Sequence, residues 1–297
     1  MSLFPGFIRK RIRTSAATIN LVAGGEGPPL LLLHGYPQTH AIWHKVAPGL
    51  ARDYTVVCAD LRGYGDSSKP LGVPGHANYS KRAMALDMIE AMEALGFIKF
   101  HVVGHDRGGR VAHRMARDHA RRVQTLTVLD ISPTLKMYES TNMQFAKAYY
   151  HWFFLIQEAP LPERMLKSMG PDYILKRLGR GKTGLKVFDR RALDEYARCF
   201  DPHCTCEDYR AAATIDLVHD RKDLHKKLSM PVLALWGRQG VIEALFDCLA
   251  DWREVALDVR GRALQCGHFI PEEKPKELLA ELRRFLRGEK PLPIRTP

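Results

Sequence analysis

One hexapeptide constrains the fold of this chain more than any other segment. It reads Gly104-His105-Asp106-Arg107-Gly108-Gly109, follows the apolar run Phe100–Val103 and precedes a helix-like stretch. This is the nucleophile-elbow pattern, which sets a reactive side chain on a sharp turn between a strand and a helix. The nucleophile here is aspartate in place of the usual serine. A carboxylate can displace a leaving group from an alkyl carbon and remain as an ester, so we expect hydrolysis of a carbon–halogen bond or an epoxide.

The partners that such a nucleophile needs follow it along the chain. Asp130 closes the apolar run Leu126–Leu129, and His268 lies near the C-terminus. Nucleophile, acid, histidine is the chain order of the α/β-hydrolase triad, so we predict Asp106, Asp130 and His268 as the catalytic residues. Glu243 competes for the place of the acid. We prefer Asp130 because it ends a strand, whereas Glu243 lies where a helix begins and can simply favour that N-terminus.

A second turn supplies the oxyanion hole. The apolar run Pro29–Leu33 has the pattern of a buried strand and ends in His34-Gly35-Tyr36-Pro37, where the backbone must turn sharply. We predict the backbone N–H groups of Tyr36 and Arg107 as the pair that binds the developing oxyanion.

Strand and helix patterns alternate along most of the chain. We predict strands at 7–13, 17–23, 29–34, 54–59, 100–105, 124–130, 231–236 and 257–264, and helices at 80–95, 107–118, 242–254 and 272–287. This alternation predicts an α/β fold with a mostly parallel central sheet. Between residues 135 and 228 the segments look helical throughout. We therefore expect a core formed by residues 1–134 and 229–297, with a helical cap at 135–228 over the strand ends where ligands bind.

Composition excludes several classes of protein. The chain has 297 residues, 45% of them hydrophobic, which is enough for one large core and an inserted subdomain. It has no apolar run of about 18 residues, so we expect no membrane span. The six cysteines lack framework spacing and indicate a cytoplasmic protein with reduced thiols. His203, Cys204 and Cys206 have no second cluster to complete a ligand set, so we predict no metal and no cofactor.

The formal net charge of +12 raises the question of a nucleic-acid partner. The Lys and Arg residues, however, lie in short scattered groups, without one stripe and without interleaved aromatics. We therefore expect no nucleic-acid partner, and interpret the charge as a solvated basic surface that draws in small anions.

Two arginines beside the nucleophile indicate the substrate. Arg107 follows Asp106 directly and Arg110 comes three positions later, so both share roughly one face of a helix that starts at the elbow. Two guanidinium groups there would keep Asp106 ionised, and a substrate carboxylate would fit their planar forks. The alternative is that both arginines neutralise Asp106 or face outward. The first reading points to a 2-haloacid as short as a haloacetate.

The sequence resembles the fluoroacetate dehalogenase (haloacetate dehalogenase) family of the α/β-hydrolases, and the resemblance runs from about residue 5 to 287. The segments that carry the resemblance are His34–His40, Asp60–Ser68, Gly104–Arg110, Tyr150–Trp152, Cys206–Arg210 and Cys266–Phe269. The resemblance implies the same catalytic residues and carboxylate clamp as above. It further implies His151, Trp152 and Tyr209 as the halide pocket, a haloacetate substrate converted to glycolate and halide, and a homodimer.

Three alternatives stay open. An epoxide hydrolase also uses an aspartate elbow and needs two cap tyrosines, for which there are candidates, but it has no use for an arginine pair. A haloalkane dehalogenase usually has tryptophan directly after the nucleophile, where this chain has Arg107. A non-catalytic ligand receptor would keep the pocket without needing Asp106, Asp130 and His268.

Overall fold

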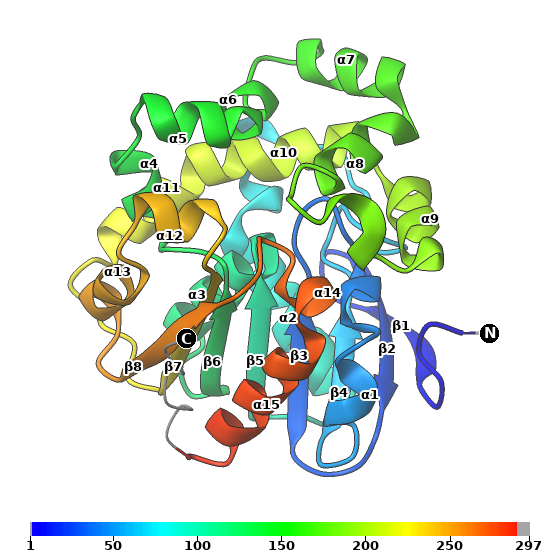
Figure 1. The fold of residues 1–297 in the computed structure, drawn as a ribbon, viewed down its shortest axis with the longest axis vertical. Helices are drawn as coiled ribbons and strands as arrows, with labels where there is room; N and C mark the ends of the chain where they lie inside the picture. The colour runs from blue at the N-terminus through cyan, green and yellow to red at the C-terminus, as the bar shows by residue number, and fades with distance from the viewer. Residues whose placement is uncertain (1, 290–297) are drawn as a thin grey trace.

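The computed structural model describes residues 2–289 and is built on one eight-stranded sheet (Figure 1). Along the sheet the strand order is β1-β2-β4-β3-β5-β6-β7-β8, with β1, β2 and β4 joined antiparallel and all other neighbours parallel. The strands are β1 (Ile8–Arg13), β2 (Thr18–Gly24), β3 (Pro29–Leu33), β4 (Thr55–Ala59), β5 (Phe100–His105), β6 (Val123–Leu129), β7 (Val232–Gly237) and β8 (Val259–Leu264). The predicted mostly parallel sheet is confirmed.

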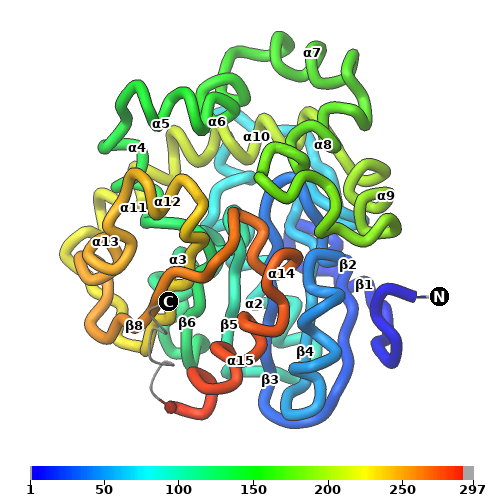
Figure 2. Tube along the Cα trace, in the orientation of Figure 1, coloured from blue at the N-terminus to red at the C-terminus, as the bar shows by residue number. Residues whose placement is uncertain are grey.

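Both faces of the sheet are covered, which explains why its central strands are apolar without alternation. In β3, Leu31 and Leu33 pack into one core cluster with two helices, α2 (Lys81–Ala94) and α3 (Arg107–Asp118). Leu30 and Leu32 pack into another with α1 (Ala47–Leu50) and α15 (Pro275–Leu286). Figure 2 shows these helices on the two sides of the sheet. The helices that flank the sheet are η1 (His40–Trp43), α1 (Ala47–Leu50), η2 (Pro74–Tyr79), α2 (Lys81–Ala94), α3 (Arg107–Asp118), α12 (Val241–Leu245), α13 (Cys248–Val255), α14 (Ile270–Glu273) and α15 (Pro275–Leu286).

The prediction of one helix over 242–254 is wrong. The chain forms two helices, α12 and α13, because Phe246 has an extended backbone and Asp247 caps the second helix. The side chain of Asp247 accepts a hydrogen bond of 3.0 Å from the backbone N–H of Ala250. This cap satisfies one of the free N–H groups at the start of α13 and fixes the break. The predicted helix over 272–287 is likewise divided, since Pro275 starts α15.

The chain between β6 and β7 is helical and lies over the carboxyl ends of the parallel strands (Figure 1). We call these segments the cap helices. They are α4 (Thr134–Glu139), α5 (Met143–Ala148), α6 (Tyr150–Leu155), α7 (Leu161–Met169), α8 (Pro171–Leu178), η3 (Gly184–Val187), α9 (Arg190–Cys199), α10 (Pro202–Ala213) and α11 (Ile215–Lys222). The division into a core of 1–134 and 229–297 and a cap of 135–228 stays a proposal; Met1 and residues 290–297 lie outside the described residues.

The strand register places the turn after β3 and the turn after β5 at the same edge of the sheet. Leu33 of β3 pairs with Gly104 of β5, so both strands end at the same height. The turn that carries Tyr36 and the turn that carries Asp106 therefore emerge side by side beneath the cap helices. Within residues 2–289, no helix has the length and apolar character needed to cross a membrane.

Candidate active site

Asp106 occupies a strained turn between β5 and α3. Its φ of 47° and ψ of −113° are unusual for a residue with a side chain, and such a conformation costs on the order of 1–3 kcal/mol. The flanking glycines make the turn possible. A Cβ on Gly104 would lie 2.4 Å from the carbonyl oxygen of Gly108, and one on Gly108 would lie 2.3 Å from that of His34. The glycines of the hexapeptide thus allow the close approach that presents Asp106.

One oxygen of Asp106 is held and the other is not. The backbone N–H of Tyr36 donates a hydrogen bond of 3.0 Å to Oδ1. A Cβ on Gly35 would lie 2.5 Å from Cβ of Asp106, so this approach also depends on glycine. Burial alone would raise the pKa of Asp106, but His268 and Arg110 outweigh burial and hold it below its ordinary value. Asp106 is therefore an ionised carboxylate with Oδ2 available to react.

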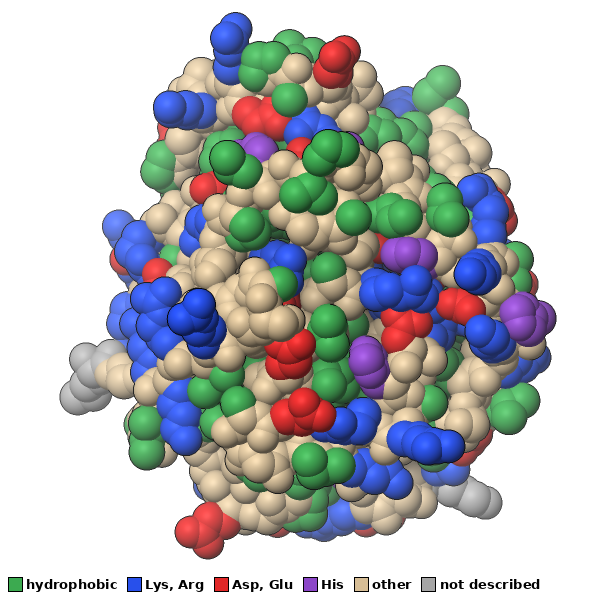
Figure 3. Space-filling view, turned by 180° about the vertical axis from the view of Figure 1, so that it is seen from behind, with side chains coloured by type: hydrophobic (Ala, Val, Ile, Leu, Met, Phe, Trp, Pro, Cys, Tyr) green, Lys and Arg blue, Asp and Glu red, His purple; other side chains and the backbone are tan. Residues whose placement is uncertain are grey.

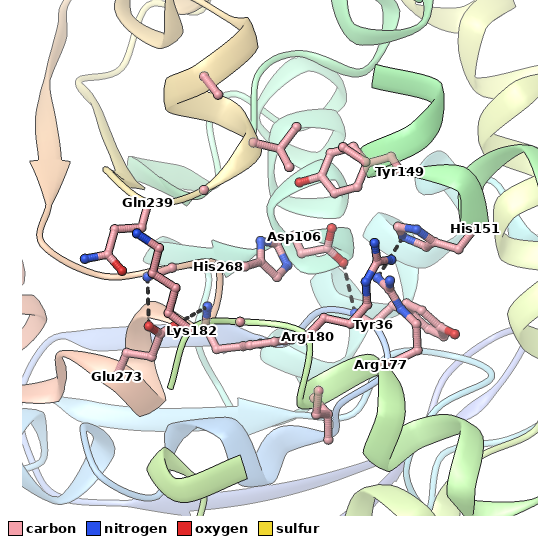
Figure 4. A pocket seen from close by; sticks show the side chains of 18 of the residues that line it. Tyr36, Asp106, Tyr149, His151, Arg177, Arg180, Lys182, Gln239, His268 and Glu273 are labelled. Atoms are coloured by element: carbon pink, nitrogen blue, oxygen red, sulfur yellow. Dashed lines mark hydrogen bonds between the residues drawn. The ribbon is translucent and has the colours of Figure 1, made fainter. Parts of the chain in front are cut away.

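His268 and Asp130 form a pair beside Asp106. Nδ1 of His268 lies 2.6 Å from Oδ2 of Asp130, and the N–H of Gly237 donates to Oδ1 of Asp130 at 2.8 Å. Figure 4 shows the imidazole of His268 next to Asp106. Burial would lower the pKa of His268, but the hydrogen bond and the charge of Asp130 raise it above its ordinary value. With Nδ1 held by Asp130, Nε2 is the nitrogen left for proton transfer.

Glu243 lies elsewhere. Its carboxylate accepts hydrogen bonds from Trp236 Nε1 and from Arg238 Nη1, the latter at 3.1 Å. The structure thus gives His268 a contact with Asp130 and uses Glu243 to bind the end of β7 and the loop that follows.

Arg107 is held by a carboxylate that the sequence reasoning did not identify. Asp208 of α10 accepts from Nε of Arg107 at 2.8 Å and from Nη2 at 2.7 Å. It also accepts from Tyr64 at 2.6 Å and from the ammonium group of Lys81. Arg107 is fully buried, and only its Nη1 is left without a hydrogen-bond partner. Neither reading of the sequence anticipated this, since Arg107 pairs with Asp208 and not with Asp106.

Arg110 keeps more of its charge unpaired. Nη1 donates to the carbonyl of Ser132 at 3.3 Å and to Oγ1 of Thr134 at 3.0 Å, whereas the buried Nε has no hydrogen-bond partner. The guanidinium lies 4.7 Å from the ring centre of Trp152. Among the contacts of the described residues, no carboxylate forms a salt bridge with Arg110.

The three predicted halide ligands meet in one aromatic cluster. His151 and Trp152 of α6 lie with their ring centres 5.8 Å and 6.4 Å from that of Tyr209 of α10. The guanidinium of Arg107 lies 4.2 Å from the ring centre of Tyr209. The hydroxyl of Tyr209 and Nδ1 of His151 are buried without a partner. Since unpaired buried polar groups are costly, their gathering here, with those of Arg107 and Arg110, indicates a site that an anion completes.

Arg177 of α8 is a further member of the cluster that sequence reasoning missed. Its Nη2 lies 3.2 Å from Nε2 of His151 (Figure 4). Because a guanidinium can only donate, Nε2 of His151 must accept, and the ring proton is on Nδ1. Burial, reinforced by the charge of Arg177, keeps the pKa of His151 far below its ordinary value. His151 is therefore neutral, with its N–H on the buried Nδ1.

These residues border a cavity of about 500 Å³. Asp106, His268, Tyr36, His151 and Tyr209 line it, whereas Arg107, Arg110 and Trp152 are not among the described residues that line it. Figure 4 shows Asp106 between His268 and His151, with Arg177 beside His151 and Tyr36. The lining also contains apolar residues, namely Leu178, Phe188, Val241, Leu245 and Phe269.

No candidate metal centre appears among residues 2–289, since no three His, Cys, Asp or Glu side chains there are arranged so that they could hold a metal ion. Sγ of Cys204 lies 3.1 Å from the hydroxyl of Tyr79, and Nε2 of His203 accepts from the N–H of Gly72 at 3.2 Å. All six cysteines are free thiols.

Comparisons with known proteins identify relatives of this chain. The sequence model of the alpha/beta hydrolase fold matches residues 28–169. The chain is 48% identical to a fluoroacetate dehalogenase of Burkholderia sp., over 96% of this chain and 95% of that protein. It is 36% identical to a soluble epoxide hydrolase of Corynebacterium sp. (strain C12), over 90% and 93% respectively. A crystal structure from Nostoc sp. PCC 7120, provisionally named an alpha/beta hydrolase, is 57% identical with a TM-score of 0.93, covering 94% of this chain and 98% of that one.

Proposed function

The chain belongs to the fluoroacetate dehalogenase family of the α/β-hydrolases, and from this we propose that it is a haloacetate dehalogenase. It would convert short 2-haloacids, fluoroacetate or another haloacetate, to the 2-hydroxy acid and halide through an ester on Asp106. The family membership supports a hydrolase. The steps proposed below use only residues of the chain and need no cofactor. The site supports the choice of substrate.

In the first step, Oδ2 of Asp106 attacks the α-carbon of the haloacid. A carbon–oxygen bond forms, the carbon–halogen bond breaks, and the halide leaves with the electron pair. Arg110, with Nη1 of Arg107, would bind the substrate carboxylate. His151, Trp152 and Tyr209 would donate hydrogen bonds to the halide; burial raises the pKa of Tyr209 and keeps its hydroxyl protonated.

In the second step, water attacks the carboxyl carbon of Asp106. Nε2 of His268 takes the proton from water, and Asp130 stabilises the imidazolium that forms. Negative charge develops on Oδ1, which the N–H of Tyr36 already approaches at 3.0 Å. The N–H of Arg107, at the first position of α3, is the proposed second donor. Collapse releases the hydroxy acid with an oxygen that came from Asp106.

One observation carries this proposal. Buried N–H groups of Arg107 and Arg110 lack partners beside an ionised aspartate nucleophile. A substrate carboxylate would satisfy these cations, whereas a neutral haloalkane or epoxide would leave them unpaired. The site does not favour a non-catalytic ligand receptor, because a receptor does not require the His268–Asp130 pair.

Epoxide hydrolysis is the second candidate. Two tyrosines, Tyr149 and Tyr209, line the cavity with Asp106, and both could protonate an epoxide oxygen. The soluble epoxide hydrolase of Corynebacterium sp. is also a relative of this chain. The unpartnered guanidinium nitrogens favour the haloacid.

A substrate panel tests the proposal. Purified protein is incubated with fluoro-, chloro- and bromoacetate, with 1-chlorobutane and with styrene oxide, and free halide or diol is measured. We expect halide from the haloacetates at a rate that Asp106→Ala abolishes. Diol formation from styrene oxide, without halide release from any haloacetate, would identify the protein as an epoxide hydrolase instead. The homodimer and the cytoplasmic location stay predictions.

A further inference from the structure

The cavity is much larger than a haloacetate requires. A water molecule takes about 30 Å³ of liquid, and a haloacetate has the bulk of only a few waters, so it fills roughly a fifth of about 500 Å³. The volume lies within the range of pockets that bind larger metabolites. The cavity therefore has room for a substrate that extends beyond the reacting carbons.

Three basic side chains of the chain between β6 and β7 also line the cavity. Arg177, Arg180 and Lys182, from the end of α8 and the segment after it, line the cavity (Figure 4). In the contacts of residues 2–289 none of the three forms a salt bridge, in contrast to Arg107, which is neutralised by Asp208. Glu273 also lines the cavity, but its oxygens accept from the N–H groups of Gly267 and Phe269.

Arg177 is the best placed of these cations. Half-buried, it contacts His151 through Nη2 and lies with its guanidinium carbon 6.0 Å from the ring centre of Tyr36. Its Nε is buried and has no hydrogen-bond partner. Arg180, by contrast, is exposed and lies over the ring of Tyr150 at 5.2 Å. A guanidinium that borders the cavity with an unsatisfied N–H and no acidic partner is a binding site for a carboxylate.

We propose that the substrate is a dianion, a 2-halodicarboxylic acid whose second carboxylate binds Arg177. This rests on the proposed function and extends it, since the carboxylate beside the reacting carbon would still use Arg110. Over the two steps one water is consumed and Asp106 passes an oxygen to the substrate, so the products are a 2-hydroxydicarboxylate, halide and a proton. Arg180 and Lys182 attract the dianion to the mouth of the cavity.

Two other roles for Arg177 predict different behaviour. If Arg177 served the halide through His151, or bound the carboxylate next to the reacting carbon, its loss would affect monoanionic and dianionic substrates alike. If the space held an apolar chain, an ester or alkyl group would be accepted as readily as a carboxylate.

A matched substrate series distinguishes these roles. kcat/KM is measured for 2-bromoglutarate, its 5-methyl monoester and 2-bromopentanoate, with 2-bromosuccinate as the shorter diacid. We expect a diacid to exceed the monoester and 2-bromopentanoate by about 10- to 100-fold, the worth of one charge-assisted hydrogen bond. Arg177→Met removes that preference, and Arg177→Lys restores part of it. Lys176→Met, which removes a neighbouring exposed charge outside the cavity, keeps it.

Equal losses on all substrates in Arg177→Met, or a wild-type protein without preference for a diacid, overturn the proposal. Binding of glutarate and butanoate to the wild-type protein by calorimetry separates this result from failure of the proposed function, because no chemistry is needed. Glutarate binding that is about 10-fold tighter and lost in Arg177→Met supports the anion site even if no haloacid is hydrolysed. Equal affinity for glutarate and butanoate overturns the proposal even if haloacetate is hydrolysed.

Discussion

At the scale of single residues, the identity of residue 106 decides the chemistry, and the residues around it decide what it can attack. The elbow glycines, Asp106 and the position of His268 were readable from the sequence because each depends on local backbone geometry. The partner of Arg107 was not. Asp208 lies about a hundred positions later, and only the placement of α10 in the folded chain brings the two charges together. The only hint was its place directly before Tyr209.

Arg110 provides the first test of substrate recognition. Arg110→Leu should lower kcat/KM for chloroacetate by about 10- to 100-fold, because a charge-assisted hydrogen bond to the carboxylate is lost. Arg110→Lys should recover little, since an ammonium cannot form the planar fork. The same substitutions should lower kcat/KM for neutral 2-chloroacetamide far less. Arg117→Lys on the same helix is the control, and an equal loss on acid and amide would count against carboxylate recognition.

The raised pKa of His268 predicts a pH profile. His268 must be neutral to accept a proton from water, so activity is absent below its pKa and appears as the pH rises through it. Because Asp130 raises that pKa above the ordinary 6.5, the acidic limb of kcat should lie above this value. Asp130→Asn should move the limb to lower pH and lower the plateau by on the order of 10⁴-fold, as in related triads. Rates of halide release measured from about pH 5 to about pH 9 decide this; an unmoved limb in Asp130→Asn would assign it to another group.

At the scale of elements, the eight strands were predictable and the contacts of the cap helices were not. Short apolar runs bounded by turns specify strands buried on both faces, as in Pro29–Leu33. Cap helices are placed by contacts distant in sequence, so Arg177 of α8 and His151 of α6 could not be paired in advance. The division between α12 and α13 was missed because Asp247 was read as part of a helix and not as a cap.

Asp208 joins the cap helices to the core. Asp208→Asn should lower the free energy of unfolding by roughly 3–5 kcal/mol, because Arg107 would be left buried without a carboxylate and Lys81 would keep only the longer contact of 3.6 Å with Asp216. Urea denaturation followed by circular dichroism measures this. Asp194→Asn breaks the exposed Arg190–Asp194 pair instead and should change stability by less than about 0.5 kcal/mol. Equal effects of the two substitutions would refute a structural role for the buried network.

At the scale of the whole molecule, charge is dispersed, and three of the exposed apolar side chains lie together on one cap helix. Figure 3 shows Lys and Arg side chains scattered among acidic and apolar ones on one face of the molecule. On α7, Leu161, Met165 and Met169 are spaced four residues apart and are 55%, 51% and 40% exposed. Residues at this spacing share one face of a helix, and an exposed apolar stripe of this kind is typical of an interface between proteins.

The expected homodimer can be tested on this stripe. Sedimentation equilibrium should give a dimer for the wild-type protein and a monomer for the double variant Leu161→Glu/Met165→Glu, because two charges would have to be buried at the interface. Leu257→Glu, at a still more exposed position outside the cap helices, should stay dimeric. A wild-type monomer would contradict the dimer, and a double variant that still dimerises would place the interface elsewhere.

The ester at Asp106 is the central intermediate of the proposed mechanism, and a single turnover in ¹⁸O-labelled water tests it directly. With protein in excess over chloroacetate, the water oxygen should enter the carboxylate of Asp106, and the glycolate should carry the unlabelled oxygen that Asp106 gave up. Mass spectrometry of the glycolate and of the peptide containing Asp106 measures both. Glycolate labelled in the first turnover, with an unlabelled Asp106, would mean that water attacks the substrate itself and would contradict the account.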